Sequence, residues 1–506
     1  MLNFARLQTP PNDGDTLIQP PLPEWAGLIE ANARLRAGYR FRLAGLPVQE
    51  VIARTSELLG VGDAPRIACG HQPAFVHAGV WVKHVVVRHI RDTRGIPAFD
   101  LVVDNDAPAS GALVVPFVEG GYVATRELDV ADGPDGSAYE GRPAIGADRL
   151  EALRAELAGL SGLDWEQTLL PAYLSGLAER TESADFVEQH VHARARLDAT
   201  LGVDLPEFRV SRVFGGPFLA DLLLDAERFA ADYNAALVEY RRNEGVRSPD
   251  RPLPDLARVH DAQETALWIY KPLQRRRRLY VRPGPDRLTL LADGTPVGEV
   301  GRRDLERDAD AALAALRPWV VRPRALTLTL WARLLACDLF VHGIGGAKYD
   351  RITDGIIRRY YGVEPPAYAC ATATLRLPLP RYGATPEQLR RAEHALRDVR
   401  FNPQRYCRGC RADLLAAREE AIRRAGELRV ARAGRLERRE AFLAIRRANA
   451  ALLEGDPEMK RRVQQDAERI RRELASDQAA MSREYFYVMH TRERLERLAE
   501  DVRRAT

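Results

Sequence analysis

Lysine is nearly missing from this sequence of 506 residues. Of its 75 lysines and arginines only four are lysines, at positions 83, 271, 348 and 460, so arginine is the default cation. The lysine ammonium is a compact point charge that arginine does not imitate, and phosphate sites use it for that reason. We therefore interpret Lys83 and Lys348, which both lie near glycine-containing turns, as candidate ligand contacts.

Long apolar runs, a signal sequence and a large net charge are also lacking. The sequence has no run of about 18 apolar residues and no signal-peptide core at its start, which predicts neither a membrane segment nor secretion. A net charge of +4 is small for this length and does not favour a nucleic-acid partner. Cys69, Cys337 and Cys370 stand alone in apolar runs, as is typical of a reducing compartment. We expect a cytoplasmic protein with no membrane or nucleic-acid partner.

The length and the changes of pattern predict several folding units. We divide the chain into an N-terminal helical segment (1–62), the first part of an α/β core (63–140), helical and small β insertions (141–316), the second part of the core (317–384) and an arm (385–506). Within the insertions, residues 267–273, 277–282 and 287–292 have the pattern of strands, with a turn at Asp293–Gly294. The expected fold class is α/β, with a parallel-sheet core that the insertions split.

The first part of the core carries the strongest functional signal. Two short apolar runs, 66–69 and 99–103, flank a helical stretch, which predicts a strand–helix–strand unit. Polar residues follow both runs, and the carboxyl ends of parallel strands form the crevice where ligands bind. The sequence therefore predicts a nucleotide or phosphate site there, with the candidate residues Gly70, His71, Gln72, His77, Lys83, Asp104, Asn105 and Asp106.

A second glycine-rich turn, residues 342–350, follows another apolar run in the second part of the core. Its glycines permit a close backbone approach to a ligand, and its lysine and aspartate are expected at the mouth of the same site. The candidate residues are Gly345, Gly346, Lys348, Tyr349 and Asp350. The spacing fits neither a P-loop nor a dinucleotide fingerprint, and a tight turn without a ligand is the alternative.

Metal chemistry is a rival interpretation of the first cluster. His71, His77, Asp104 and Asp106 are residue types that bind divalent metals, which would favour a hydrolase or nucleotidyltransferase. The segment has no His-x-His or His-x-x-x-His pair, so we predict no metal. Cys407 and Cys410 form a single CxxC without a second pair, and we interpret them as exposed cysteines at a helix start.

The last part of the chain is expected to form a long helical hairpin. Residues 413–453 contain no proline, and a break at 455–457 separates them from a second helix over 458–504. In that second helix apolar residues recur every seven positions, at Ala467, Leu474, Met481, Val488 and Leu495. A heptad repeat is typical of a coiled coil. We therefore predict an antiparallel coiled-coil arm that joins two copies of the chain.

Three segments together resemble the enzyme family that adds cysteine in the last step of bacillithiol synthesis. They are CGHQPAFVHAGVWVK (69–83), IPAFDLVVDND (96–106) and the stretch from VVRP to TLRL (320–377). The resemblance covers most of the chain and implies a Rossmann-like core, two connecting inserts and a C-terminal coiled coil. His71 stands where the family has glutamine, and Asp104–Asn105–Asp106 replaces a Glu–Asp–His core, which favours a diverged relative with another substrate.

From the residues and the resemblance we expect a ligase that joins an amino or thiol compound, such as cysteine, to a small acceptor. His71, Asp104 and Asp106 are the predicted catalytic residues, with Asp104 as the base or as the group that holds a substrate amine. Lys83 and Lys348 would neutralise developing charge, and ATP or ADP would serve as activator or regulator. A non-catalytic coiled-coil scaffold with a vestigial pocket is the remaining alternative.

Overall fold

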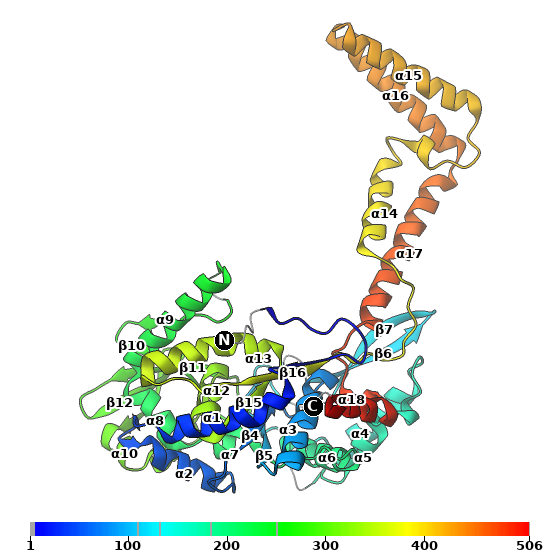
Figure 1. The fold of residues 1–506 in the computed structure, drawn as a ribbon. Helices are drawn as coiled ribbons and strands as arrows, with labels where there is room; N and C mark the ends of the chain where they lie inside the picture. The colour runs from blue at the N-terminus through cyan, green and yellow to red at the C-terminus, as the bar shows by residue number, and fades with distance from the viewer. Residues whose placement is uncertain (1–5, 109–110, 131–132, 183–184, 249–250, 505–506) are drawn as a thin grey trace.

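The computed structural model describes residues 6–108, 111–130, 133–182, 185–248 and 251–504. These residues form a broad body, from which a helical arm projects (Figure 1). Within the described residues no helix has the length and apolar character needed to cross a membrane.

The body is built on a six-stranded sheet in the order β1-β16-β15-β4-β5-β8. The five strands from β16 to β8 are parallel, and β1 adds to the edge in the antiparallel direction. Their bounds are β1 Thr16–Gln19, β4 Ile67–His71, β5 Ala98–Val102, β8 Glu207–Arg209, β15 Leu339–His342 and β16 Ala369–Ala373. The expected α/β class, with a parallel sheet that an insertion splits, is confirmed.

The direction in which successive strands add to the sheet reverses beside β4. After β4, the chain adds β5 and β8 on one side, and after the insertion it adds β15 and β16 on the other. In register, His71 on β4 lies opposite Val102 on β5. The prediction that residues 69–71 and 104–106 lie at one edge of the sheet, on adjacent parallel strands, is therefore confirmed.

Alternating residues of the strands face two separate hydrophobic cores. Cys69 and Val102 belong to the core under α3, α4, α5, α6 and α18, whereas Ala68 and Leu101 face α2, α8, α9 and α12. The helices that cover the first face are α1 Trp25–Ala37, α3 Ala78–Arg94, α4 Ala147–Ala158, α5 Leu170–Ala178, α6 Phe186–Thr200 and α18 Arg492–Arg504. Those on the second face are α2 Val48–Leu58, α8 Gly216–Leu224, α9 Ala226–Glu244, α12 Ala325–Trp331 and α13 Ile344–Ile356.

Helix α3 follows β4 directly and lies close to the sheet. The His77 side chain caps its first turn by accepting a hydrogen bond from Gly79 N, and the helix ends at Gly95 in the left-handed conformation. A Cβ atom at position 79 would lie 2.5 Å from Ala373 O on β16. Glycine therefore permits this close approach, and the valines of the helix fill the space beneath it.

The insertion contributes a second sheet, in the order β13-β12-β11-β10-β14. Its strands are β10 Ala262–Tyr270, β11 Arg277–Pro283, β12 Arg287–Ala292, β13 Thr295–Gly301 and β14 Val320–Pro323, and β9 Arg258–Val259 pairs with β10. Asp293 and Gly294 both have positive φ at the turn between β12 and β13. The three strands and the turn expected there are confirmed, and β14 leads from this sheet back to α12 and the main core.

Smaller elements complete the body. The hairpins are β2 Arg42–Leu43 with β3 Leu46–Pro47, and β6 Ala112–Glu119 with β7 Tyr122–Asp129. Short helices are α7 Val210–Val213, α10 Arg302–Arg307 and α11 Ala309–Ala314, and π-helical turns at Ala332–Ala336 and Ile357–Tyr361 extend α12 and α13. Residues 210–213 form the short helix α7 directly after β8 ends at Arg209.

The arm consists of two successive helix pairs. Helix α14 (Pro386–Asp398) lies beside α17 (Glu458–Ala480), and beyond them α15 (Ala412–Val430) packs on α16 (Arg435–Gly455), as Figure 1 shows. Residues 413–453 therefore form two helices with a turn between them, not the single helix expected. Cys407 and Cys410, in the loop before α15, form a disulfide.

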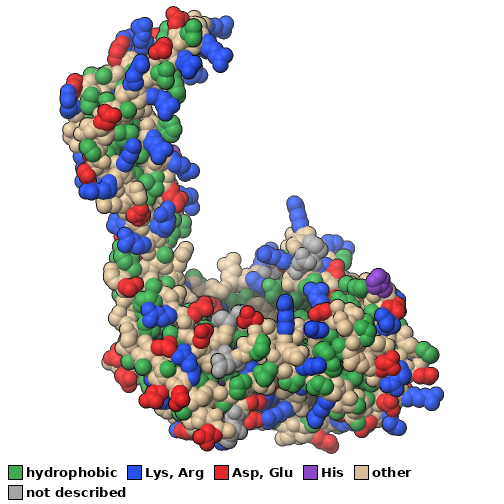
Figure 2. Space-filling model, turned by 180° about the vertical axis from the view of Figure 1, so that it is seen from behind, with side chains coloured by type: hydrophobic (Ala, Val, Ile, Leu, Met, Phe, Trp, Pro, Cys, Tyr) green, Lys and Arg blue, Asp and Glu red, His purple; other side chains and the backbone are tan. Residues whose placement is uncertain are grey.

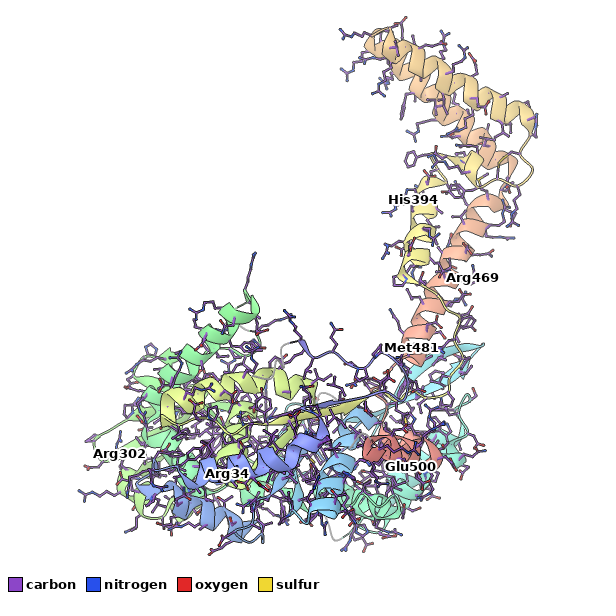
Figure 3. All side chains as sticks on the ribbon, in the orientation of Figure 1. Arg34, Arg302, His394, Arg469, Met481 and Glu500 are labelled. Carbon is purple, nitrogen blue, oxygen red and sulfur yellow. A yellow bond between two sulfur atoms is a disulfide. The ribbon has the colours of Figure 1, made fainter. Side chains whose placement is uncertain are left out.

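The expected single helix over 458–504 is also wrong. Helix α17 ends at Ala480, close to where Met481 marks the junction with the body in Figure 3, and α18 packs against α3. The heptad positions Val488 and Leu495 are buried in the body core. Helices that pack in a protein core have nearly the same spacing of apolar residues as helices in a coiled coil. The spacing alone therefore could not tell the two apart.

Candidate functional site

The residues that follow β4 point in different directions. A Cβ atom on Gly70 would lie 3.2 Å from Leu101 O, so glycine lets β4 and β5 pack closely. The His71 side chain points into the sealed core under α3, whereas Gln72 is exposed and donates a hydrogen bond from Nε2 to Asp106 Oδ2 at 2.7 Å. Gln72 thus links the end of β4 to the end of β5.

Asp104 and Asp106, both expected to be catalytic, have opposite surroundings. Asp104 is fully buried, and its oxygens accept hydrogen bonds from Arg209 Nε at 2.9 Å and from the backbone and hydroxyl of Ser211. Asp106 keeps 36% of its side chain exposed, and its carboxylate accepts from Gln72 and from Arg276. Only Asp106 is placed to meet a ligand, so we correct the prediction of Asp104 as the base.

A cavity of about 230 Å³ opens beside Asp106, between the carboxyl end of β5 and the second sheet. We call it the arginine pocket because three arginines lie in its wall. Its lining residues are Val103, Asn105, Asp106, Tyr233, Leu253, Pro254, Trp268, Arg276, Arg278, Pro323, Arg324, Ala325, Leu326 and Leu328.

Arg324 is the least satisfied cation of this pocket. Its Nη1 donates to Glu264 Oε1 at 2.9 Å, but its buried Nε and Nη2 have no hydrogen-bond partner among the described residues. The guanidinium lies 4.5 Å from the ring centroid of Trp268. Burial lowers the pKa of Arg324, although Glu264 opposes that shift. Because an unmet buried charged donor is costly, these two N–H groups mark a place for an acceptor from a ligand.

Asn105 and Arg276 complete the polar wall. Asn105 Nδ2 donates to Pro323 O at 2.7 Å, which fixes the amide orientation, and its buried Oδ1 has no partner within the described part of the chain. Arg276 Nη1 donates to Asp106 Oδ1 at 2.8 Å and to Asn105 O at 3.1 Å. The residues of the pocket wall therefore include two unpartnered donors and one unpartnered acceptor, all three buried, beside a carboxylate held in place.

The sequence did not single out most of this wall. Trp268 comes from β10, Arg276 directly precedes β11 and Arg324 directly follows β14, all far from residues 104–106 in the chain. The basic run at 275–278 was the only local signal, and because alternate residues of a strand face opposite sides, Arg276 and Arg278 line the pocket while Arg277 does not.

The other predicted residues near β4 belong to the enclosed side. Lys83 is buried and its ammonium donates to Gly70 O, while His71 Nε2 lies 3.2 Å from Asp100 Oδ2. Burial lowers the pKa of His71 well below its usual value and that of His77 to about 4. His77 lies at the start of α3, where its Nε2 is 3.2 Å from Glu484 Oε2. The four residues of the metal interpretation, His71, His77, Asp104 and Asp106, thus have separate partners.

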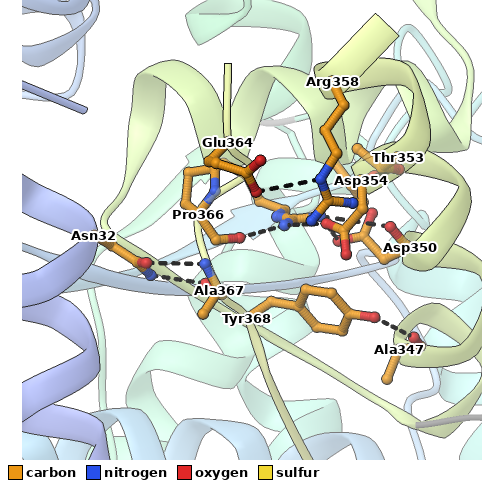
Figure 4. A network of polar contacts seen from close by, with 12 residues as sticks. Asn32, Ala347, Asp350, Thr353, Asp354, Arg358, Glu364, Pro366, Ala367 and Tyr368 are labelled. Atoms are coloured by element: carbon orange, nitrogen blue, oxygen red, sulfur yellow. Dashed lines mark hydrogen bonds and ion pairs between the residues drawn. The ribbon is translucent and has the colours of Figure 1, made fainter. Parts of the chain in front are cut away.

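The second glycine segment also differs from its prediction. Helix α13 begins at Ile344, so Gly345 and Gly346 lie in its first turn. Asp350, expected at a pocket mouth, is buried and accepts from Arg333 Nη1 at 2.7 Å and His342 Nε2 at 3.0 Å, in the network of Figure 4. Burial opposes its charge, but these two neighbours hold the pKa of Asp350 below its usual range. Asp350 therefore serves the packing of α13.

Lys348 and Tyr349 line an open hollow of about 700 Å³ that they share with Tyr240 and Glu244 of α9. This hollow lies on the face of the sheet that α9 and α13 cover, whereas Lys83 is buried under α3 on the other face. The expectation that the two lysines converge on one pocket is therefore wrong.

Comparison with known proteins adds no assignment. No family model matches the chain, and no curated protein is similar to it. The function is therefore inferred from the chemistry of the arginine pocket and the strand ends beside it.

Proposed function

We propose that this protein is an enzyme that joins an amino or thiol compound to a small acceptor, and that the arginine pocket holds the anionic group of one substrate. The observation that carries the proposal is the pair of buried, unpartnered donors on Arg324, in the wall of a cavity beside the carboxyl end of the parallel strand β5. In open α/β sheets, ligands bind at that edge.

The free polar atoms define the ligand class. Nε and Nη2 of one guanidinium form a planar fork that matches two oxygens of a carboxylate or phosphate. Asn105 Oδ1 accepts a hydrogen bond from an N–H or O–H group on the same ligand. A cavity of about 230 Å³ suits a small acid or the phosphate end of a nucleotide such as ATP or ADP. We infer a small anion that also carries an amino or hydroxyl group.

Asp106 supplies the base in this proposal. As the nitrogen or sulfur bonds to the acceptor, the bond from the acceptor to its leaving group breaks, and that group departs with the electron pair. The attacking amine or thiol loses its proton in the same step, and a half-exposed carboxylate beside the pocket can accept that proton. The hydrogen bonds from Gln72 and Arg276 fix both oxygens of Asp106, which holds it in a reactive position. Arg324 then stabilises negative charge that develops on the anionic substrate.

The core itself is proposed to be Rossmann-like. In order along the sheet, its parallel strands are the third, second, first, fourth and fifth along the chain, which is the strand order of doubly wound dinucleotide-binding folds. The reversal beside β4 would form the ligand crevice of such a fold. This order agrees with the resemblance to the cysteine-adding enzymes of bacillithiol synthesis and supports a diverged relative of them.

A ligand screen on two matched variants tests the proposal. Thermal unfolding is measured with ADP, ATP, inorganic phosphate and small amino and hydroxy acids, and then Kd is measured by calorimetry for each compound that raises Tm. Arg324→Lys keeps the charge that pairs with Glu264 but loses the fork, and we expect Kd to rise about tenfold or more. Arg277→Lys, on the residue between Arg276 and Arg278 that lies outside the pocket, should leave Kd unchanged. Equal Kd values in both variants would refute the pocket assignment.

We also propose that the arm is a coiled coil that joins two copies of the chain. Exposed apolar side chains gather near its tip, where Val430 is 86%, Leu436 77% and Phe442 57% exposed. In Figure 2, basic and acidic side chains are interspersed along the arm, including its tip. Phe442→Asp should convert a dimer to a monomer by light scattering, whereas Val259→Asp on the body should not. A monomeric wild-type protein at micromolar concentration would contradict the dimer.

A further inference from the structure

A second cluster of reactive side chains lies on the opposite face of the same two strands. Cys69 Sγ, His84 Nε2 and a carboxylate oxygen of Asp100 all lie within 4.8 Å of one another. His71 Nε2 is 2.9 Å from His84 Nε2 and 3.2 Å from Asp100 Oδ2. Helix α3 covers the cluster, beside β4 and β5 (Figure 1), and all four residues are buried.

One oxygen of this cluster is unsatisfied. Asp100 is fully buried, yet its Oδ2 has no hydrogen-bond partner among the described residues, although it faces His71 Nε2. Asp100 Oδ1 accepts the weak hydrogen bond of the Cys69 thiol at 3.1 Å and lies 3.6 Å from His84 Nε2. A buried carboxylate oxygen normally accepts a hydrogen bond or coordinates a metal. Asp100 Oδ2 instead faces His71 Nε2, and the proton of that imidazole lies on Nδ1.

The Nδ1 atoms of His71 and His84, which face away from the cluster, each have a hydrogen-bond partner. His71 Nδ1 faces the Gln72 carbonyl, and His84 Nδ1 faces Asp198 Oδ2 at 3.1 Å. An acceptor facing Nδ1 keeps the imidazole proton on Nδ1. In a neutral imidazole the lone pair is then on Nε2, which faces the centre of the cluster. A backbone carbonyl and a carboxylate in these positions are the outer partners that metal-binding histidines use.

The charged side chains next to the cluster have hydrogen-bond or ion-pair partners of their own. Asp198 also accepts hydrogen bonds from Trp81 Nε1 and the Tyr487 hydroxyl, both at 3.0 Å. Arg194 pairs with Glu207, and the Lys83 ammonium donates to Gly70 O. Cys69, His71, His84 and Asp100 are therefore the side chains of this region whose protons do not have one clear placement. The Nε2 atoms of His71 and His84 are 2.9 Å apart, so without metal one proton lies between the two rings.

We propose that Cys69, His71, His84 and Asp100 bind one zinc ion. A thiolate, two imidazoles and a carboxylate are all zinc ligands, and four protein ligands make a closed structural site. Zinc–nitrogen bonds of about 2.0 Å place tetrahedral ligand atoms about 3.3 Å apart, close to the separations of His71 from His84 and Asp100. Cys69 Sγ lies within 4.8 Å of the His84 and Asp100 ligand atoms, and it would move inward to complete the site. The ion replaces the thiol proton of Cys69 and the inner proton of His84, and it gives Asp100 Oδ2 its missing partner.

The zinc ion would act on the pocket through the loop that leaves β4. It ties α3 to β4 and β5 through its ligands, and His71 precedes Gln72, whose side chain holds Asp106. The site is therefore structural and separate from the arginine pocket. Its existence does not depend on the proposed reaction.

Cobalt substitution tests the site on the full-length protein. The reduced protein is stripped with a chelator and titrated with Co²⁺, and we expect a thiolate-to-cobalt charge-transfer band and visible bands of tetrahedral intensity, which added Zn²⁺ abolishes. Cys69→Ser should remove the charge-transfer band and reduce bound zinc by at least about tenfold. Cys370→Ser, a buried cysteine on β16 of the same sheet, should keep both.

The reduced CxxC pair is the competing thiolate source, and it provides the decisive control. The double variant Cys407→Ser/Cys410→Ser should retain the cobalt band. A band that disappears in this variant but persists in Cys69→Ser overturns the proposal, as does a wild-type protein without a charge-transfer band. Zinc X-ray absorption of the wild type covers the case in which Cys69→Ser does not fold: one sulfur with nitrogen and oxygen neighbours supports the site, and two sulfurs or none overturn it.

Discussion

The two sides of the β4–β5 edge hold similar side chains in opposite conditions. On the enclosed side, Asp100 and Asp104 are fully buried among histidines, arginine and hydroxyl groups. On the open side, Asp106 lines a cavity together with an arginine that keeps two unmet donors. A carboxylate at a strand end therefore indicates a ligand only where its surroundings leave hydrogen-bonding capacity unused. The enclosed side should govern stability, and the open side should govern binding.

The largest contrast is expected between two aspartates that are two residues apart. Asp104→Ala removes the partner of Arg209 and Ser211 from a buried site and should lower the free energy of unfolding by about 3 kcal/mol. Asp106→Ala breaks a partly exposed ion pair with Arg276 and should cost less than about 1 kcal/mol. Urea unfolding of both variants measures the difference. Equal losses would erase the distinction between the two sides.

Two amide side chains sharpen the same contrast. Asn32 joins α1 to the loop before β16, where it donates to Ala367 O and accepts from Ala367 N (Figure 4). It also donates to Asp338 O, just before β15. Asn32→Ala should therefore lower the free energy of unfolding by about 2 to 3 kcal/mol. Gln72→Ala removes one exposed hydrogen bond to Asp106 and should change it by less than about 1 kcal/mol. A larger loss in Gln72→Ala would mean that the open side is structural.

The smallest expected effect is a pH dependence on the enclosed side. Burial lowers the pKa of His190, on α6, to about 3, so the folded protein keeps it neutral while the unfolded chain binds a proton below about pH 6.5. Its contribution is therefore fully present above that pH and is lost as the pH falls, at about 1.4 kcal/mol per pH unit.

His190→Gln keeps an acceptor for the Tyr173 hydroxyl and should flatten the stability profile between pH 6.5 and 5 by about that slope. His394→Gln, on the exposed surface of α14 in Figure 3, is the matched control and should leave the profile unchanged. Identical profiles for both variants would show that His190 is not kept neutral by its surroundings.

The local sequence pattern was enough to predict where the two strand ends lie. It was not enough to predict what the residues at those ends do. The spacing of apolar runs placed residues 69–71 and 104–106 at one edge because a parallel strand–helix–strand unit has few arrangements. It could not show that Asp104 accepts a hydrogen bond from Arg209, 105 residues later, or that Arg324 lines the same cavity as Asn105. Those contacts depend on how β8 and the second sheet pack, which no local pattern encodes.

The arm shows a second limit of pattern. The sequence predicted a helical projection over 385–506, and helices α14 to α17 form one. The same heptad continued through Val488 and Leu495, which instead fill the body core. Residues 485–487 are three buried aromatics in a segment that leaves the helix, and the hydrogen bond from Tyr487 N to Val76 O ties it to the loop before α3. An apolar period specifies a buried face but not the surface that buries it.

The central claim is that the arginine pocket receives an anion. The most direct measurement is a crystal structure of the protein grown with the anionic compound that binds it most tightly. We predict two oxygens of that compound within hydrogen-bond distance of Arg324 Nε and Nη2, with an N–H or O–H group facing Asn105 Oδ1. An anion bound instead in the hollow beside Lys348, with the arginine pocket unchanged, would contradict the account.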